Sequence, residues 1–217
     1  MSTLGVVMAF TGWPAEALEF YEGLAADNSR TYWLAHRDVY ERDVRAPMEE
    51  LLAELEPEFG PWKIYRPYRD VRFSADKSPY KDHIGATFER GGYVQLSAHG
   101  LAAGNGMWQM DSGQLDRYRR AVADDVAGAR LQALVADIRA QGIEVGGHSV
   151  LRTAPRGYPR DHPRIELLRY RGLVAWRQWP VEPWLGTPAA RDRVVEFLRA
   201  SAPLRDWLDE HVGPATA

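Results

Sequence analysis

The chain has 217 residues, of which 45% are apolar and 26% are charged, and its 27 basic and 30 acidic side chains leave a formal net charge of −3. A chain of this length can bury a sizeable core without a disulfide or a structural metal, and the composition is typical of a soluble globular protein. The absence of cysteine excludes disulfides, thiolate metal sites and a cysteine nucleophile.

The sequence shows no repeat, no low-complexity tract and no long linker, so we expect one domain over residues 1–217. The apolar run at residues 4–10 has no basic segment before it, and it is much shorter than the roughly 20 residues of a membrane span. We therefore expect a cytoplasmic protein with no membrane partner.

Helical spacing of apolar residues predicts a first helix up to about residue 26 and a second helix from about residue 29 to 55. Ser29 and its neighbours are good capping residues for the second helix. Pro47 lies inside this helix, where it should kink or restart it. Residues 63–81 fit neither the helical nor the strand period, which indicates a short strand followed by an ordered loop.

The middle and the end of the chain contain most of the predicted strands. Gly91 and Gly92 separate two β-like runs and predict a hairpin. The expected strands are residues 83–88, 93–99, 101–108, 143–145, 149–153 and 173–179, and the expected helices are residues 111–123, 126–141 and 166–170. Thr187-Pro188 and Ser201-Ala202-Pro203 each indicate the start of a C-terminal helix. The pattern predicts an α+β fold, with a mainly antiparallel sheet and helices from both chain ends packed on it.

The basic residues gather in two short segments. Residues 63–81 hold six basic and two acidic side chains, and residues 152–177 hold seven and two, whereas residues 1–62 hold four and twelve. Ten of the thirteen basic residues in the two segments are arginine, which binds carboxylate or phosphate with two parallel hydrogen bonds. This pattern favours a pocket for a small anionic ligand.

A structural alternative explains the same residues. Asp70, Asp76, Asp82, Asp161 and Glu166 lie within or beside the two basic segments, where they could neutralise several arginines in an ion-pair network. In that case the protein would be an interaction module whose charges are structural.

Motifs of known chemistry are scarce. The chain has no Walker loop, dinucleotide fingerprint or nucleophile elbow, and its six histidines show no metal-binding spacing, so we expect no cofactor and no metal. Tyrosines interleave with arginines in residues 65–81, as in single-strand binding proteins. The acidic net charge makes a broad nucleic-acid footprint the weaker alternative.

Three sequence blocks resemble the domain-of-unknown-function 2461 family, a group of bacterial and fungal conserved hypothetical proteins. The blocks are residues 11–41, 66–85 and 154–169, and the resemblance extends from about residue 10 to 213. It implies no particular activity. The family pattern falls on Asn28, Arg30, Trp33, His36, Tyr40, Arg66, Arg69, Asp70, Arg72, Phe73, Ser74, Asp76, Lys77, Pro79, Tyr80, Lys81, Pro155, Gly157, Asp161, His162 and Pro163.

We therefore expect three segments to converge on one polar cleft: the loop of residues 66–83, the loop of residues 156–164 and the start of the second helix. The expected ligand-binding residues are Asn28, Arg30, Trp33, Arg66, Arg69, Arg72, Ser74, Lys77, Tyr80, Lys81, Arg156 and Arg164. If chemistry takes place, His36 or His162 with Asp70 or Asp161 is the expected acid–base pair, because histidine titrates near neutrality. The alternative role for Asp161 is to cap the helix that begins at Pro163.

Overall fold

The computed structural model describes residues 9–70, 72 and 76–215. The chain divides into two compact units, each made of two stretches of sequence. The first unit comprises Met1–Ala103 and Gln178–Glu196, and the second comprises Gly104–Arg177 and Phe197–Ala217. The expected single domain stays a prediction, and the two units are described separately below.

Six strands follow the order β1-β2-β3-β4-β6-β5, and the expected α+β class is confirmed. The strands are β1 (Trp62–Ile64), β2 (His83–Phe88), β3 (Tyr93–Ser97), β4 (Gly100–Met107), β5 (Glu144–Gly146) and β6 (Leu173–Trp179). The pairs β1–β2, β2–β3 and β5–β6 are antiparallel. Gly91 and Gly92, both with positive φ, form the predicted hairpin turn, and the Phe88 N–H donates to the Gly92 carbonyl at 3.1 Å.

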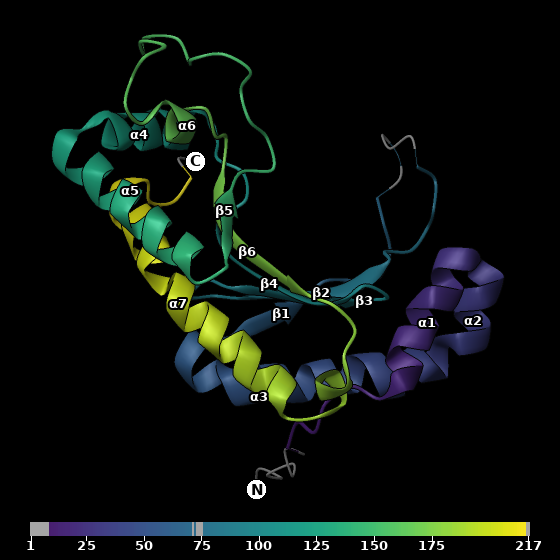
Figure 1. Cartoon of the computed structure of the whole chain (residues 1–217). Coiled ribbons are helices and arrows are strands. Elements are labelled where there is room, and N and C mark those ends of the chain that lie inside the picture. Colours follow the sequence, from purple (N-terminus) through teal and green to yellow (C-terminus); the bar gives the residue numbers. More distant parts are fainter. Residues whose placement is uncertain (1–8, 71, 73–75, 216–217) are drawn as a thin grey trace, which may run out of the picture. The chain divides into compact units, whose positions relative to one another are not determined.

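The first unit begins with helices α1 (Ala15–Ala26) and α2 (Arg30–Val39), which lie side by side (Figure 1). Ser29 caps α2 as predicted, because its Oγ accepts a hydrogen bond from the Tyr32 N–H at 3.1 Å. A π-helical segment, Tyr40–Arg45, joins α2 to α3 (Ala46–Phe59). Pro47 lies in the first turn of α3, so the predicted restart of the helix is confirmed.

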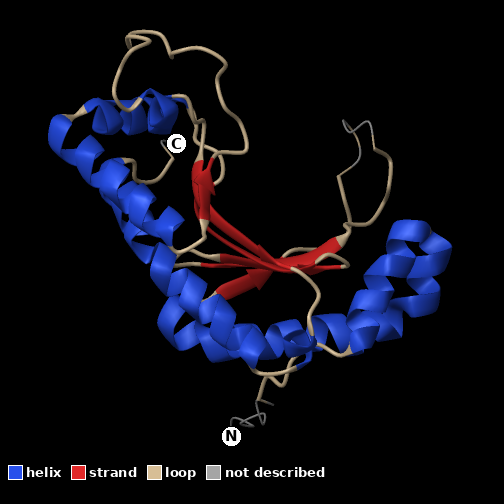
Figure 2. Cartoon of the chain, in the orientation of Figure 1, coloured by secondary structure: helices blue, strands red, loops and turns tan. Residues whose placement is uncertain are grey.

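The core of the first unit lies between α3 and one face of β1–β3 (Figure 2). The buried residues of α3 are Met48, Leu51, Leu52 and Leu55, and those of the two central strands include Ile84, Ala86, Val94 and Leu96. The Phe59 ring at the end of α3 meets the Phe88 ring of β2, with 5.8 Å between ring centroids. Since alternate residues of a strand point to opposite faces, the other face of this sheet is left to polar side chains.

The second unit contains α4 (Ser112–Ala123), α5 (Asp125–Ala140) and the short α6 (Ile165–Leu168). Asp111 and Gln114 form a capping box at the start of α4. The buried Tyr118 of α4 donates from its hydroxyl to the Leu167 carbonyl of α6 at 2.9 Å. The buried Trp207 donates from its indole N–H to the Ala127 carbonyl of α5 at 3.0 Å. These bonds join helices that are far apart in sequence.

Two predicted elements are wrong. The C-terminal segment is one helix, α7 (Ala189–His211), and not two, although Pro203 lies inside it. The Ser201 hydroxyl donates to the Phe197 carbonyl at 2.8 Å, and Leu204 and Leu208 are buried one turn apart, so packing outweighs the helix-breaking tendency of proline. The predicted strand 149–153 is reduced to one isolated bridge, in which Val150 pairs with Tyr170. A 3-10 turn, Pro183–Gly186, precedes α7.

Candidate functional site

The loop between β1 and β2, residues 65–82, closes at its base like a short hairpin (Figure 1). Tyr68 and Tyr80 form an antiparallel bridge. The Arg69 N–H donates to the Pro79 carbonyl at 2.9 Å, and the Lys81 N–H donates to the Pro67 carbonyl at 2.8 Å. We call this segment the β1–β2 loop. The predicted binding residue Ser74 lies outside the described residues.

The start of α2 holds the β1–β2 loop in place. The indole of Trp33 stacks on the Tyr80 ring with 4.4 Å between centroids and 7° between planes. The Asn28 amide donates to the Tyr80 carbonyl at 3.1 Å and accepts from the Tyr80 N–H at 3.0 Å. The structure therefore brings together three predicted binding residues, but their rings and polar groups bind one another. In this arrangement they anchor the loop.

Two of the predicted arginines in the β1–β2 loop already have acidic partners. Arg69 pairs with Asp76, and Arg72 pairs with Asp70 at 2.7 Å. Hydrogen bonds from the Ser78 hydroxyl and backbone N–H, and then from Arg69, lower the pKa of Asp76 to about 2. The hydrogen bond from Arg72 likewise lowers the pKa of Asp70. The structural alternative thus describes these two arginines well.

Arg66 and Lys81 form a different arrangement at the base of the same loop. Neither has a carboxylate within ion-pair distance among the residues that the structure describes. The Arg66 charge lowers the pKa of Asp70, but the Asp70 carboxylate is bound to Arg72. The Lys81 ammonium lies 5.3 Å from the centroid of the Tyr65 ring. Burial lowers the pKa of Lys81, and the Arg66 charge lowers it further. We call these two cations with Tyr65 the Arg66–Lys81 cluster.

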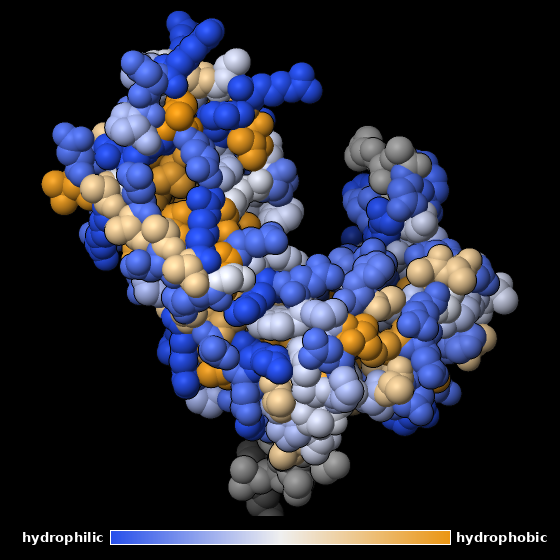
Figure 3. Space-filling view, viewed as in Figure 1, coloured by the Kyte–Doolittle hydropathy of each residue, from blue (hydrophilic) through white to orange (hydrophobic). Residues whose placement is uncertain are grey.

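The polar face of β1–β3 continues from this cluster. Lys63 lies opposite Thr87, and Thr87 lies opposite Tyr93, so the three side chains share one face. The Thr87 hydroxyl donates to the Tyr65 oxygen at 3.4 Å, and the Tyr93 hydroxyl donates to the Gln95 side-chain oxygen at 2.8 Å. This face offers hydroxyl and amide groups beside two cations. Hydrophilic residues also cover the β1–β2 loop, at the upper right in Figure 3.

One carboxylate–imidazole pair lies on this face. His83 opens β2 opposite Ser97, and its Nδ1–H donates to the Asp82 carboxylate at 2.7 Å. The carboxylate fixes the tautomer and leaves Nε2 as the ring nitrogen that can accept a proton. The register of the two chain segments is uneven here. Tyr65 bonds to Gly85 and Tyr68 pairs with Tyr80, so residues 66–67 lie opposite residues 81–84, and the longer segment forms a bulge. Bulges often re-aim side chains in this way.

The histidines that the sequence favoured have other partners. His36 lies on α2, where its Nδ1 is 2.9 Å from the Tyr32 carbonyl and its ring stacks on the Tyr32 ring. The Nδ1 of His162 accepts from the Arg164 N–H at 3.0 Å. The N-cap residue of α6 is Arg164, and no side chain caps this helix, so the expected capping by Asp161 is wrong. Asp161 is exposed, and Asp70 binds Arg72.

The second basic segment belongs to the second unit. Arg164 is 8% exposed, and its guanidinium donates to the carbonyls of Val122, Ala123 and Asp124 at the end of α4, at 2.7 to 3.1 Å. Arg156 is exposed in the long loop before α6. Of these two predicted binding residues, Arg164 is buried against the end of α4 and Arg156 is exposed to solvent. The expected convergence of all three segments on one cleft stays a prediction.

Two further predicted residues lie in the first unit. Arg30 is exposed at the start of α2, and its charge opposes the rise in the Tyr80 pKa that burial causes. Lys77 is exposed in the β1–β2 loop.

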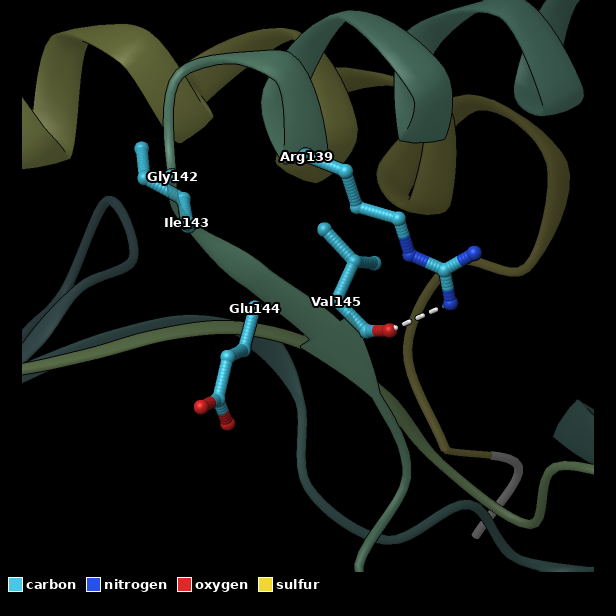
Figure 4. Close-up of a pocket in the computed structure, with 5 residues that line it drawn as sticks. All are labelled: Arg139, Gly142, Ile143, Glu144 and Val145. Atoms are coloured by element: carbon cyan, nitrogen blue, oxygen red, sulfur yellow. Dashed lines mark hydrogen bonds between the residues drawn. The ribbon is translucent and has the colours of Figure 1, made fainter.

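A shallow pocket of about 480 Å³ lies in the second unit, beside β5 (Figure 4). It is lined by Arg139, Gly142, Ile143, Glu144 and Val145. Arg139 donates to the Val145 carbonyl and to Glu166, both at 2.8 Å, and Glu144 points away from it. Arg139, the one cation among these lining residues, is thus already bound to Val145 and Glu166.

Within residues 9–70, 72 and 76–215, no three histidine, aspartate or glutamate side chains gather as they would around a metal ion. Across the same residues, none of the helices combines the length and the apolar character that crossing a membrane requires.

Sequence reasoning missed the polar sheet face and the Asp82–His83 pair. A signal for the face was present, since apolar and polar residues alternate along 83–88 and 93–97. The choice of His83 over the other histidines had no such signal, because it depends on the hydrogen bond between His83 and Asp82 in the folded chain.

Comparison with known proteins gives a family. A family model described as "Conserved hypothetical protein (DUF2461)" matches residues 16–207, which is most of the chain. No curated protein and no solved structure matches the chain. The extent of the family match agrees with the three sequence blocks that suggested it. The chain belongs to the conserved hypothetical protein family DUF2461.

Proposed function

We propose that the protein binds a small anionic ligand, through a phosphate or carboxylate group, at the Arg66–Lys81 cluster. The observation that carries this proposal is that the two cations are close enough for Arg66 to lower the pKa of Lys81, while no carboxylate in the described chain pairs with either. The neighbouring Arg69 and Arg72 each have an acidic partner. Two neighbouring cations with no carboxylate in direct contact are what a bound anion would stabilise.

The chemistry of the cluster supports an oxyanion as the ligand. A guanidinium offers two parallel N–H donors, and an ammonium adds a compact charge from a second direction. The Tyr65 hydroxyl accepts from the Thr87 hydroxyl at 3.4 Å, and its own O–H is left as a neutral hydrogen-bond donor beside the cations. Together these groups can satisfy several oxygens of one phosphate or carboxylate.

Acid–base chemistry, if the bound ligand reacts, is best served by His83. Its imidazole is oriented by Asp82 on the same polar face of the sheet, with Nε2 left to exchange a proton. The two histidines favoured by the sequence are engaged with backbone groups through Nδ1, and no carboxylate among the residues that the structure describes pairs with either. His83 therefore replaces His36 and His162 in the proposal.

The structural alternative remains the better description of three arginines. Arg69 and Arg72 are neutralised within the β1–β2 loop, and Arg164 binds the end of α4. We therefore propose none of these three as a ligand-binding residue. Asn28, Trp33 and Tyr80 serve the site indirectly, because they hold the loop that carries Lys81.

The proposal is tested by thermal unfolding of the purified protein with phosphate, sulfate, sugar phosphates, nucleotides and dicarboxylates at constant ionic strength. A ligand at about a hundredfold its Kd stabilises a protein by about 2.7 kcal/mol, which raises the Tm of a chain of this size by roughly 5 to 10 °C. We expect at least one phosphate or carboxylate compound to give such a shift.

Two variants and one matched control locate the binding. Arg66→Ala and Lys81→Ala should each weaken binding about 10- to 100-fold, the usual effect of losing a hydrogen bond to a charged group. Arg72→Ala removes another exposed cation from the same loop, one that is paired with Asp70, and binding should persist. Equal losses in all three variants, or no shift with any anion, would contradict the proposal.

A further inference from the structure

The second unit displays an aromatic ring that the proposed anion site does not use. Trp108 follows β4 and is 57% exposed, more than any other aromatic side chain in the described chain. One face of its indole stacks on the His148 imidazole, with 4.5 Å between ring centroids and 14° between planes. The His148 Nδ1 lies 2.8 Å from the Trp108 carbonyl, so the two rings are fixed to each other.

The backbone beneath these rings is closely packed. A Cβ on Gly172 would come within 2.1 Å of the Trp108 carbonyl oxygen, so that position accepts only glycine without rearrangement. The Met110 N–H donates to the Arg171 carbonyl at 3.1 Å, and the Arg171 N–H donates to the Ser149 carbonyl at 3.0 Å. Three chain segments therefore hold the backbone that carries the indole, and the His148 ring restricts the indole itself, which reduces the entropy that a ligand must offset on binding.

One apolar and one basic residue belong to the backbone segments beside the ring pair. Val150, two residues from His148, is 46% exposed and pairs with Tyr170. Arg171 lies in the segment that bonds to Ser149 and Met110, and its side chain is exposed. We call Trp108, His148, Val150 and Arg171 the Trp108 platform.

The loop that follows the platform is strongly basic. Arg152, Arg156 and Arg160 are exposed, and neither they nor Arg171 have an ion-pair partner among the residues that the structure describes. Glu166, the next acidic residue after Asp161 in the sequence, is paired with Arg139. An exposed aromatic ring beside several unpaired cations is complementary to a planar base next to a phosphate.

We infer that the Trp108 platform binds single-stranded nucleic acid, with one base stacked on the free face of Trp108 and phosphates on Arg171 and the arginines of residues 152–160. Small ligands bind in concave sites that enclose most of their surface. Trp108 instead offers one open face, and the cations extend along the chain, which suits a strand of several nucleotides. This inference concerns the second unit and stands independently of the proposed anion site.

Fluorescence anisotropy with labelled octamers of thymidine and uridine tests the inference, using the full chain at about 50 mM salt. Replacing the ring by an aliphatic side chain in Trp108→Leu should weaken binding at least about fivefold, as expected for the loss of one base stack. Trp108→Phe keeps an aromatic face and should retain most of the affinity. Leu34→Ala, which alters a similarly exposed apolar residue of the first unit, should bind like the wild type.

The salt dependence gives an independent readout. In a plot of log affinity against log salt concentration, Arg171→Ala should reduce the slope by about 0.7, the value for one phosphate contact to a single strand. Adenosine monophosphate should bind at least about tenfold more weakly than the octamers. Absence of octamer binding, wild-type affinity in Trp108→Leu at an unchanged Tm, or equally tight binding of the mononucleotide would overturn the inference.

Discussion

Replacement of Arg164 by alanine should destabilise the second unit strongly. Arg164 is 8% exposed, and its Nε and Nη2 donate to three consecutive carbonyls, those of residues 122, 123 and 124, where α4 ends and α5 begins. The last carbonyls of a helix have no partner within the helix and carry its negative end charge, so a buried cation there is stabilising.

The magnitude follows from the bonds that are lost. A hydrogen bond from a charged donor contributes about 1.5 to 3 kcal/mol, and water that enters after truncation can satisfy part of the carbonyl oxygens. We therefore expect Arg164→Ala to lower the free energy of unfolding by about 3 to 5 kcal/mol, within the range of severe single substitutions. Arg164→Lys should lose about half as much, because one ammonium cannot reach all three carbonyls in the geometry of the guanidinium.

Urea unfolding followed by far-ultraviolet circular dichroism measures the change as a shift in the denaturation midpoint. Arg156→Ala is the matched control, since Arg156 is an exposed arginine of the same segment and should change stability by no more than about 0.5 kcal/mol. If Arg164→Ala lost less than about 1 kcal/mol, or no more than Arg156→Ala, the structural role of Arg164 would be refuted and its predicted ligand-binding role would return.

Three more predictions follow from single contacts. Asn28→Ala removes both hydrogen bonds to the Tyr80 backbone and should cost about 2 kcal/mol in urea unfolding, whereas Asn28→Asp, which keeps the acceptor, should cost less. Because the pKa of Asp76 falls from 3.8 to about 2 on folding, the ionised carboxylate contributes stability above pH 3.8, and this contribution is lost as the pH falls through 2. The stability of the wild type relative to Asp76→Asn should therefore decline between pH 3.8 and 2. A constant difference between the two proteins in pH-dependent melts would contradict this prediction. A Cβ on Gly128 would come within 2.1 Å of the Val122 carbonyl and 2.6 Å of Arg164 Nε, so Gly128→Ala and Arg164→Ala should be non-additive in a double-mutant cycle, and strict additivity would show that the two positions are not coupled.

Local signals in the sequence predicted much of the fold. Ser29 as a cap, Pro47 at a helix start and the Gly91-Gly92 turn each act over a few residues, and the structure confirms all three. The continuity of α7 through Pro203 could not be predicted in this way, because it depends on burial of Leu204 and Leu208 in packing that a local pattern does not contain.

The candidate site shows the same division. The two basic segments were visible as charge patterns, and the pairing of Arg72 with Asp70, two residues away, was open as a structural alternative. Composition alone could not separate these arginines from Arg66, or show that Arg164 reaches the end of a helix some 40 residues earlier in the chain. Roles of individual arginines depend on tertiary partners, which are the part of the site that the sequence leaves open.

The most direct test of the proposed anion site is a phosphate titration of the isotopically labelled protein followed by backbone amide and side-chain NMR shifts. Saturable shifts concentrated at residues 63–66 and 81–87, lost in Lys81→Ala and retained in Arg72→Ala, are the predicted result. Shifts confined to residues 152–164, or shifts that grow linearly with ionic strength and are the same in all variants, would contradict a specific site at the Arg66–Lys81 cluster.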